Sequence, residues 1–407
     1  MDTKNQTDIN RYILLLEKPG YSFLFAFIVY FALSTLGGSP FRTQELAYFN
    51  YLADAFLHGQ LNLRLIPTST FDLSFYNGNF YLYWPPMPAI VLMPFVALFG
   101  VGFSDVFFTV LVGATNVAVV AMLLREAHSE KLIVADEIYR AWLVLFFALG
   151  TVHVYLAPFG NVWFTAQVLG FLFVGLGYVS AIKLKGVASF VVAGVMMACA
   201  MLTRNHLIFT GIWPAYYLLH KNWNNRPRLF FYTVLAFLPV FILGMLFLLY
   251  NHARFGNPFE LGIQYHNMSL FFEENYKKYG AFNIYYLPIN FYYQYIHYPL
   301  PITEESYMGG SLFLLSPVFF YAFRGIFRGY RNPNVVAWMA SILATSIPIL
   351  LLMGTGWIQY GPRYTLDFTI PLLMLTANGV QPTSRRLLFY LTAISIIQYI
   401  PGVFNFS

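Results

Sequence analysis

Residues Leu229–Tyr250 read LFFYTVLAFLPVFILGMLFLLY, a continuous apolar run without a charged side chain. A helix needs about 20 apolar residues to cross roughly 30 Å of hydrocarbon, and this run is long enough. Membrane-spanning β-barrels use alternating segments of about 10 residues instead, so a continuous run of this length excludes a barrel. We therefore expect an all-α, polytopic membrane protein.

The composition of the whole chain agrees with this expectation. Of 407 residues, 58% are hydrophobic and 10% are charged, and the mean hydropathy is +0.60, whereas a soluble domain averages about 25% charged residues. Cys199 is the only cysteine, so no intrachain disulfide forms. The apolar stretches predict about eleven spans within a single domain, 1–407. These spans are expected at 20–37, 105–124, 140–157, 164–182, 187–203, 206–220, 229–250, 309–323, 335–353, 364–380 and 387–403.

Lys and Arg are distributed unevenly between the two sides that these spans define. Sixteen of the 23 fall in the N-terminal segment and in alternate connections, and cytoplasmic connections carry such an excess. The N-terminus is therefore predicted to be cytoplasmic and the C-terminus to lie outside. The outer set is Arg42, Arg64, Arg204, Arg254, Lys277, Lys278 and Arg363. Because the net charge of +6 is scattered near span ends, it indicates orientation and no nucleic-acid partner.

Two long connections are predicted on the outer side. The apolar run Met87–Gly100 is too short for a span and begins among prolines, which favours a re-entrant or interfacial helix. Residues 38–104 then form a large first outer loop with two membrane-surface helices, near Arg42–His58 and Met87–Phe99. Residues 251–308 form a second outer loop, rich in Tyr, Asn and charged residues.

The first outer loop concentrates ionisable groups next to a membrane span, where charge is costly and often functional. In a helix over 42–57, Glu45 is expected in the first turn, where a carboxylate suits the helix dipole. A helix-start acid with no further role fits that position equally well. Asp54 is nine positions later and, at about 100° per residue, faces the opposite side. Only one of these two carboxylates is expected to face a cavity.

Two arginines are predicted at outer ends of spans. Arg204 lies in Met201-Leu-Thr-Arg-Asn-His206, and Arg363 lies in Gly361-Pro-Arg-Tyr-Thr-Leu-Asp367. Each side chain either extends to lipid headgroups or clamps a phosphate, which a planar guanidinium fits well. An ion pair between Arg363 and Asp367, four residues apart, is a competing explanation.

The histidine and glycine patterns give little support to a metal site and none to a nucleotide loop. Six of the eight histidines are predicted outside, and none has the close spacing of a zinc site. They are His58, His153, His206, His252, His266 and His297. The glycine pairs Gly354-Thr-Gly356 and Gly309-Gly310 lack the strand–turn–helix context of a nucleotide loop. The tyrosines of the second loop suit packing at the membrane interface or, alternatively, stacking on a sugar.

Four segments together resemble the GT-C class of polytopic membrane glycosyltransferases, in particular the protein O-mannosyltransferases and lipid A aminoarabinose transferases, which use polyprenyl-phosphate sugars. The resemblance covers roughly residues 20–380. Its segments are Gln44-Glu45 with Phe56–Leu61, Tyr76–Tyr81 leading to Pro85-Pro86 and Leu98–Gly100, Leu202–Asn205, and Asn251–Glu260 followed by Tyr360–Tyr364. Two positions depart from the family pattern. Gln44 stands where the family usually has Asp, and Trp84 stands where it often has Lys or His.

The resemblance implies transfer of a sugar from a polyprenyl-phosphate donor to an acceptor hydroxyl on a glycan, lipid or protein at the outer face of a plasma or inner membrane. A single displacement would invert the anomeric carbon. Glu45 is then the expected base, with Asp54 as the alternative, and Arg204, Arg363 and Arg254 are expected to bind the phosphate. Tyr81, Tyr265 and Tyr364 are expected to contact the sugar or the acceptor. No cofactor is expected, and a divalent metal is left open.

Two other functions compete with this interpretation. A transporter or flippase of the lipid carrier predicts charge at mid-membrane and repeated halves with broken helices, and the sequence has neither. A non-catalytic GT-C-like protein that binds lipid or assembles the cell envelope is supported by Gln44 and Trp84.

Overall fold

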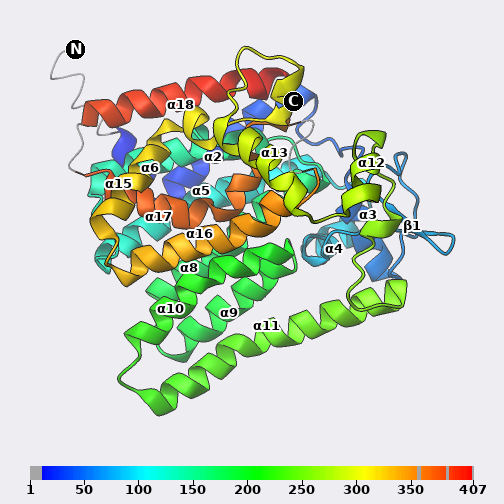
Figure 1. The fold of residues 1–407 in the computed structure, drawn as a ribbon, viewed down its shortest axis with the longest axis horizontal. Coiled ribbons are helices and arrows are strands. Elements are labelled where there is room, and N and C mark those ends of the chain that lie inside the picture. The colour runs from blue at the N-terminus through cyan, green and yellow to red at the C-terminus, as the bar shows by residue number, and fades with distance from the viewer. Residues whose placement is uncertain (1–11, 355–358, 382–384, 406–407) are drawn as a thin grey trace.

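The computed structural model describes residues 12–354, 359–381 and 385–405, and it is predominantly helical (Figure 1). The helices are α2 (Pro19–Ser34), α3 (Tyr48–Leu57), α4 (Met87–Phe99), α5 (Asp105–Ser129), α6 (Glu137–Leu149), α7 (His153–Leu156), α8 (Val162–Lys183), α9 (Val187–Met201), α10 (Ile212–Lys221), α11 (Arg226–Phe255), α12 (Leu270–Tyr279), α13 (Leu287–Phe291), α14 (Leu312–Leu315), α15 (Phe320–Gly329), α16 (Pro333–Leu351), α17 (Thr369–Gly379) and α18 (Arg385–Asn405). The predicted all-α class is confirmed.

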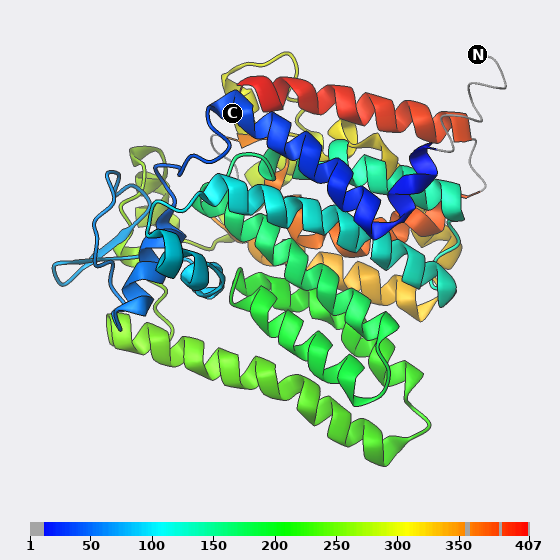
Figure 2. The same ribbon diagram turned by 180° about the vertical axis from the view of Figure 1, so that it is seen from behind.

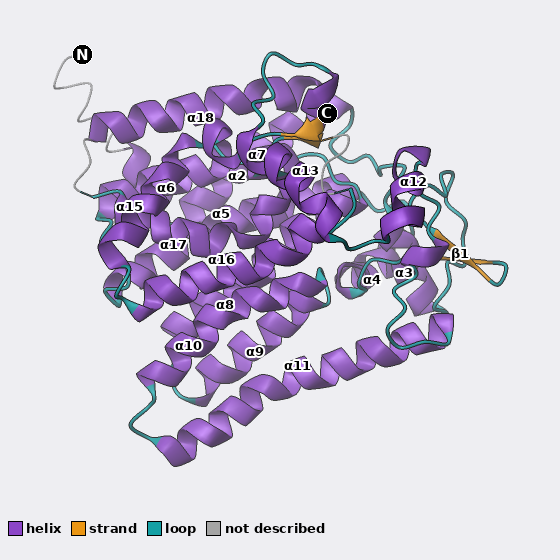
Figure 3. Cartoon of the chain, in the orientation of Figure 1, coloured by secondary structure: helices purple, strands orange, loops and turns teal. Residues whose placement is uncertain are grey.

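Strands are confined to two short pairs in the described part of the chain (Figure 3). β1 (Ser74–Tyr76) and β2 (Asn79–Tyr81) form an antiparallel hairpin in the first loop. β3 (Met308–Gly309) and β4 (Gln359–Tyr360) pair in parallel.

Six of the described helices are long and apolar enough to cross a membrane: α2, α5, α8, α11, α16 and α18. The other predicted spans are helical but shorter or interrupted. For example, a 3₁₀ turn over Asn205–Gly211 precedes α10, and another over Arg363–Phe368 precedes α17. An integral membrane protein is therefore supported, while the count of eleven spans and the sidedness stay predictions. Residues 1–11, on which the predicted cytoplasmic N-terminus depends, lie outside the described residues, as does Gly356.

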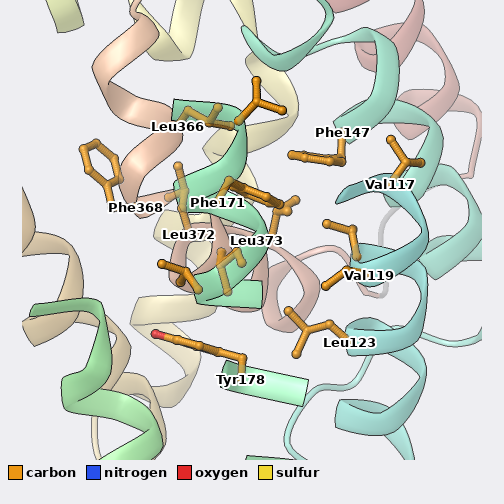
Figure 4. Packing of buried hydrophobic residues seen from close by; sticks show 14 of the residues in the cluster. Val117, Val119, Leu123, Phe147, Phe171, Tyr178, Leu366, Phe368, Leu372 and Leu373 are labelled. Carbon is orange, nitrogen blue, oxygen red and sulfur yellow. The ribbon is translucent and has the colours of Figure 1, made fainter. Parts of the chain in front are cut away.

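The core of the bundle consists of apolar side chains from α5, α6, α8 and α17 (Figure 4). Phe147 of α6 and Phe171 of α8 stack with their ring centroids 4.9 Å apart. Gly325 and Gly379 let α15 and α17 pack backbone to backbone, because a Cβ on either residue would meet the main chain of the other helix. Small residues are the usual solution for close helix contacts in membranes.

Helix α11 lies along one side of the molecule and packs against α9 (Figures 1 and 2). Only 6% of its most apolar window is buried inside the protein. Phe230, Phe237, Phe241 and Leu249 are among the large apolar side chains that it exposes. In a membrane protein such a surface is compatible with lipid, because lipid chains are as apolar as these side chains.

The two long loops meet at one end of the bundle, where α3, α4, α12 and β1 gather (Figures 1 and 2). The backbone of the second loop pairs with that of the first: Asp72 N–H donates to Asn267 O at 3.0 Å, and Asn267 N–H donates to Leu73 O at 2.8 Å. The predicted helix Met87–Phe99 has the bounds of α4.

The predicted helix over 42–57 is wrong in its first turn, because α3 begins at Tyr48. Glu45 therefore lies in a turn before the helix and not at its start. The cause is that the preceding backbone is held by other elements. Gln44 N–H donates to Asp105 Oδ1 at 2.8 Å, and its side-chain Nε2 donates to Phe159 O at 2.7 Å. These contacts hold Gln44 in a conformation outside the helix, so that α3 begins only at Tyr48.

Candidate functional site

A cavity of about 280 Å³ lies where the two loops meet the ends of the bundle helices. The first loop contributes residues 71–72 and 83–85, the second loop contributes residues between 261 and 282, and α8 contributes Trp163 and Phe164. The turn after α9 contributes residues 204–206, and the turn before α17 contributes residues 363–364. Polar groups that are far apart in the sequence thus line one cavity.

Asp72 is the carboxylate that lines this cavity. Its Oδ1 is 2.8 Å from His266 Nε2, and its Oδ2 accepts a hydrogen bond from Trp163 Nε1 at 3.0 Å. Because an ionised carboxylate only accepts hydrogen bonds, Nε2 of His266 carries the hydrogen. The Asp72 backbone has φ 64°, in the left-handed region. Such a conformation is costly for a residue with a Cβ and is enriched at functional sites.

Arg204 is the first of two cavity arginines, and it is neutralised. Its Nε and Nη2 lie 3.1 and 3.0 Å from Asp367 Oδ2, which His206 Nε2 also approaches at 2.7 Å. Both Arg204 and Asp367 are buried. This ion pair fixes Arg204 and His206 in the cavity wall.

Arg363 is the second arginine, and among the described residues it has no carboxylate partner. Its Nε donates to Gln359 Oε1, and its guanidinium carbon lies 4.8 Å from the centre of the Tyr364 ring. The competing local pair between Arg363 and Asp367 does not form. Residues 363–368 are a 3₁₀ helix, in which about three residues complete a turn, so positions four apart do not align. Among the described residues, no carboxylate therefore lies within 4.0 Å of the Arg363 guanidinium to form an ion pair with it.

Aromatic rings form much of the remaining wall. Tyr83 and Trp84 stack with centroids 3.8 Å apart, and the Tyr83 ring meets His266 edge-on at 4.6 Å. Burial, followed by the nearby Asp72 charge, raises the pKa of Tyr83 well above its usual value, so its phenol stays neutral. Trp84, which replaces the basic residue common in the resembled family, thus supplies an apolar face to the cavity.

The two acids predicted as catalytic, Glu45 and Asp54, lie outside this cavity wall. Glu45 is exposed, and neither Glu45 nor Asp54 is among the described residues that line the cavity. Asp54 is held by Arg64, whose Nε and Nη2 donate to its two oxygens at 2.9 Å each. The structure therefore gives Asp54 a local ion-pair partner.

The other predicted site residues divide between the cavity and the packing around it. Tyr364 lines the cavity with Arg204 and Arg363. Arg254 is buried and ties α11 to the first loop, because its Nη1 donates to Leu82 O at 2.7 Å. Tyr81 and Tyr265 pack on Phe255 at 5.3 and 5.7 Å. These three are not among the described cavity-lining residues.

Sequence reasoning did not single out Asp72, His266 or Trp163. Asp72 and His266 were visible only as an outer-loop acid and an outer-loop histidine. Their contact joins residues 194 positions apart, so no local spacing could have indicated it.

No group of three or more His, Cys, Asp or Glu side chains that could hold a metal ion occurs within residues 12–354, 359–381 and 385–405. Two His–Asp pairs lie at the cavity, Asp72–His266 and His206–Asp367. The oxygen of Asp367 that contacts His206 is also shared with Arg204.

Comparison with solved structures identifies the fold. The archaeal oligosaccharyltransferase AglB from Archaeoglobus fulgidus, in complex with an inhibitory peptide and a dolichol-phosphate, matches 95% of this chain and 55% of its own at 13% identity, with a TM-score of 0.54. The chain has a GT-C-like fold. The same archaeal enzyme in complex with Zn and sulfate matches 95% of this chain and 52% of its own at 13% identity, with a TM-score of 0.53.

A second GT-C enzyme is also similar. ArnT from Cupriavidus metallidurans bound to undecaprenyl phosphate matches 96% of this chain and 62% of its own at 15% identity, with a TM-score of 0.48. This chain thus spans between 52% and 62% of the length of these three structures. No family model and no curated protein matches the sequence.

Proposed function

We propose that this GT-C-like protein transfers a sugar from a polyprenyl-phosphate donor to an acceptor hydroxyl. The observation that carries the proposal is the cavity itself, in which Arg363, without an ion-pair partner among the described residues, occurs together with the Asp72–His266 pair. The phosphate-carrying lipid bound to AglB, whose fold this chain shares, supports the same donor class.

Arg363 is assigned to the donor phosphate. A guanidinium offers planar, paired donors to phosphate oxygens, and the low-dielectric surroundings of a buried site strengthen that attraction. Arg204 lines the same cavity, but its charge is paired with Asp367, so we assign it a supporting role as a hydrogen-bond donor in the cavity wall. The exposed apolar side chains of α11 are compatible with the lipid tail outside the protein.

The reaction needs one proton acceptor. The acceptor oxygen attacks the anomeric carbon, the bond from that carbon to the phosphate oxygen breaks, and the polyprenyl phosphate leaves with the bonding electrons. The proton of the acceptor hydroxyl goes to the Asp72–His266 pair, in which Asp72 orients the ring and His266 Nδ1 holds the lone pair. A single displacement of this kind inverts the anomeric carbon and needs no second carboxylate, in contrast to the glycosidases.

Glu45 is the second candidate for the base. It carries a carboxylate in the first loop next to the segment that packs on α8, where Val162 N–H donates to Leu46 O at 3.2 Å. Asp72 is favoured over Glu45 because Asp72 lines the cavity with the two arginines. The two assignments make opposite predictions for single variants.

The test is binding of the carrier by the full-length protein in lipid nanodiscs. Wild type should bind a polyprenyl phosphate at least 100-fold more tightly than the matching polyprenol, which lacks the phosphate. Arg363→Gln should remove most of that preference, since it deletes the charge but keeps a polar side chain. Arg254→Gln is the matched control, because Arg254 is buried outside the cavity.

Equal affinity of the wild-type protein for the phosphate and the alcohol would contradict the proposal. Carrier binding without any change in surface glycans, measured by mass spectrometry of cells with and without the protein, would favour a non-catalytic lipid-binding role.

A further inference from the structure

A second cavity of about 110 Å³ lies beside the first and differs from it in chemistry. The two cavities share Phe272, Met353 and Gly354 as wall residues. The second cavity is walled by α12, α13 and the π-helical turn Tyr292–Ile296. None of its lining residues carries a formal charge, whereas the first cavity contains two arginines and a carboxylate. The second cavity therefore suits an uncharged group.

Gln294 is the unusual residue of this second cavity. Its side chain is buried, with 3% of the residue exposed, and within the described part of the chain neither Oε1 nor Nε2 has a hydrogen-bond partner. The neighbouring amide of Asn290 is fully used as a donor, because Nδ2 donates to Leu350 O at 2.9 Å and to Leu352 O at 2.8 Å. Buried polar groups are nearly always paired, so an unpaired amide that lines a cavity calls for an occupant.

The backbone around Gln294 is also unusual. The turn Tyr292–Ile296 is π-helical and continues directly from α13. Such turns are rare and occur frequently at functional sites. The structure therefore combines a rare backbone turn with an unpaired amide at the same position.

We propose that this second cavity binds two adjacent hydroxyl groups of the donor sugar, an inference that rests on the proposed function above. A carboxamide presents a donor and an acceptor side by side. One hydroxyl accepts from Nε2–H and its neighbour donates to Oε1, which pairs both orphaned atoms at once.

The cavity walls fit the same ligand. Phe271, Phe272, Tyr286 and Tyr293 line the same cavity as Gln294, and their flat apolar rings suit the C–H face of a sugar ring. The absence of charge among the lining residues disfavours a phosphate or carboxylate there. The phosphate then lies in the first cavity near Arg363, and the sugar extends past Phe272 into the second.

The experiment uses the full-length protein in nanodiscs with two kinds of probe. One is bare polyprenyl phosphate, and the other is polyprenyl phosphate carrying mannose, glucose or galactose. Wild type should bind at least one sugar-bearing lipid more tightly than the bare carrier. Gln294→Leu should weaken binding of that lipid about 10- to 100-fold and leave binding of the bare carrier within about twofold. Gln60→Leu is the matched control, since it makes the same substitution at an exposed glutamine that lines neither cavity, and it should bind both probes as wild type does.

Deoxy analogues of the sugar provide a measurement on the wild-type protein that does not depend on folding of a variant. Removing either of two neighbouring hydroxyls should weaken binding to wild type, and Gln294→Leu should be insensitive to the same removals. Analogues that all bind wild type as tightly as the parent, or equal binding of the sugar-bearing lipid by Gln294→Leu and wild type, would mean that the cavity holds water only and would overturn the inference. Failure of the proposed function is distinguishable, because wild type would then show no preference for bare polyprenyl phosphate over polyprenol.

Discussion

The two ends of the helix bundle differ in how their charged and polar side chains are paired. At the end where α2 begins, the buried Arg140 donates to Glu17, and Lys221 Nζ lies 2.8 Å from Glu130 Oε2. At the cavity end, Arg363 has no carboxylate partner and Gln294 has no hydrogen-bond partner among the described residues. At the first end these two cations are paired with carboxylates of the chain itself, whereas at the second end Arg363 and Gln294 are left for a ligand that supplies a negative charge and hydroxyl groups. We take this difference as the physical signature of the site.

The largest expected effect is that of Asp72→Asn on sugar transfer. The amide keeps the shape of the side chain but removes the charge that orients His266, so turnover should fall about 10²- to 10⁴-fold. Transfer is measured with purified variants once a donor has been identified from the binding panel. The melting temperature should change little, since the cavity end does not depend on Asp72 for its apolar packing.

The turnover of Glu45→Gln is measured alongside that of Asp72→Asn. Because Glu45 is exposed and outside the cavity wall, its turnover should stay within about threefold of wild type if the Asp72–His266 pair is the base. The reverse pattern, with normal turnover of Asp72→Asn and none of Glu45→Gln, would assign the base to Glu45 and contradict the assignment of the Asp72–His266 pair.

At the opposite end, Glu17→Leu should act on stability and not on function. It leaves the buried guanidinium of Arg140 without its partner, and removing one member of a buried pair costs about 3–5 kcal/mol. Denaturant unfolding in mixed micelles measures the loss. Carrier binding per folded molecule should be unchanged, and a selective loss of binding would show that the two ends are coupled.

The sequence predicted the helical membrane architecture and the bounds of α4, because hydrophobic length and proline position are local properties. It also predicted that the two loops and the arginine-bearing turns lie together. The sequence could not predict which side chains pair with one another at the cavity. Asp72 meets His266 across 194 positions and Arg204 meets Asp367 across 163. The competing local pair between Arg363 and Asp367 is absent because a 3₁₀ turn replaces the α-helix. Glu45 was misplaced for a related reason, since contacts of Gln44 with distant elements prevent the first helical turn.

Gln44→Asp tests that last explanation and has a smaller expected effect. An ionised aspartate cannot donate to Phe159 O, so the substitution leaves that carbonyl without its partner and should cost about 1–2 kcal/mol of unfolding free energy. Gln44→Glu is the matched control for charge, and it should be destabilised to a similar degree. A gain in transfer activity with Asp at position 44 would instead indicate that the resembled family's acid position is still aligned for catalysis in this chain.

The smallest expected effect concerns the partly exposed pair of Glu130 and Lys221 at the non-cavity end. The hydrogen bond from Lys221 lowers the pKa of Glu130 in the folded protein. A carboxyl group whose folded pKa is depressed adds stability above its unfolded pKa, near 4.3, and loses it as the pH falls through the folded value. Both side chains are 42% exposed, so solvent screening limits the contribution to at most about 1 kcal/mol. The stability difference between wild type and Glu130→Gln should therefore be present at pH 6 and 7 and decline as the pH falls below about 4.3. A difference that does not change with pH would mean that the glutamine disturbs packing. A carrier affinity that changes with the titration of Glu130 would mean that this end also contributes to binding.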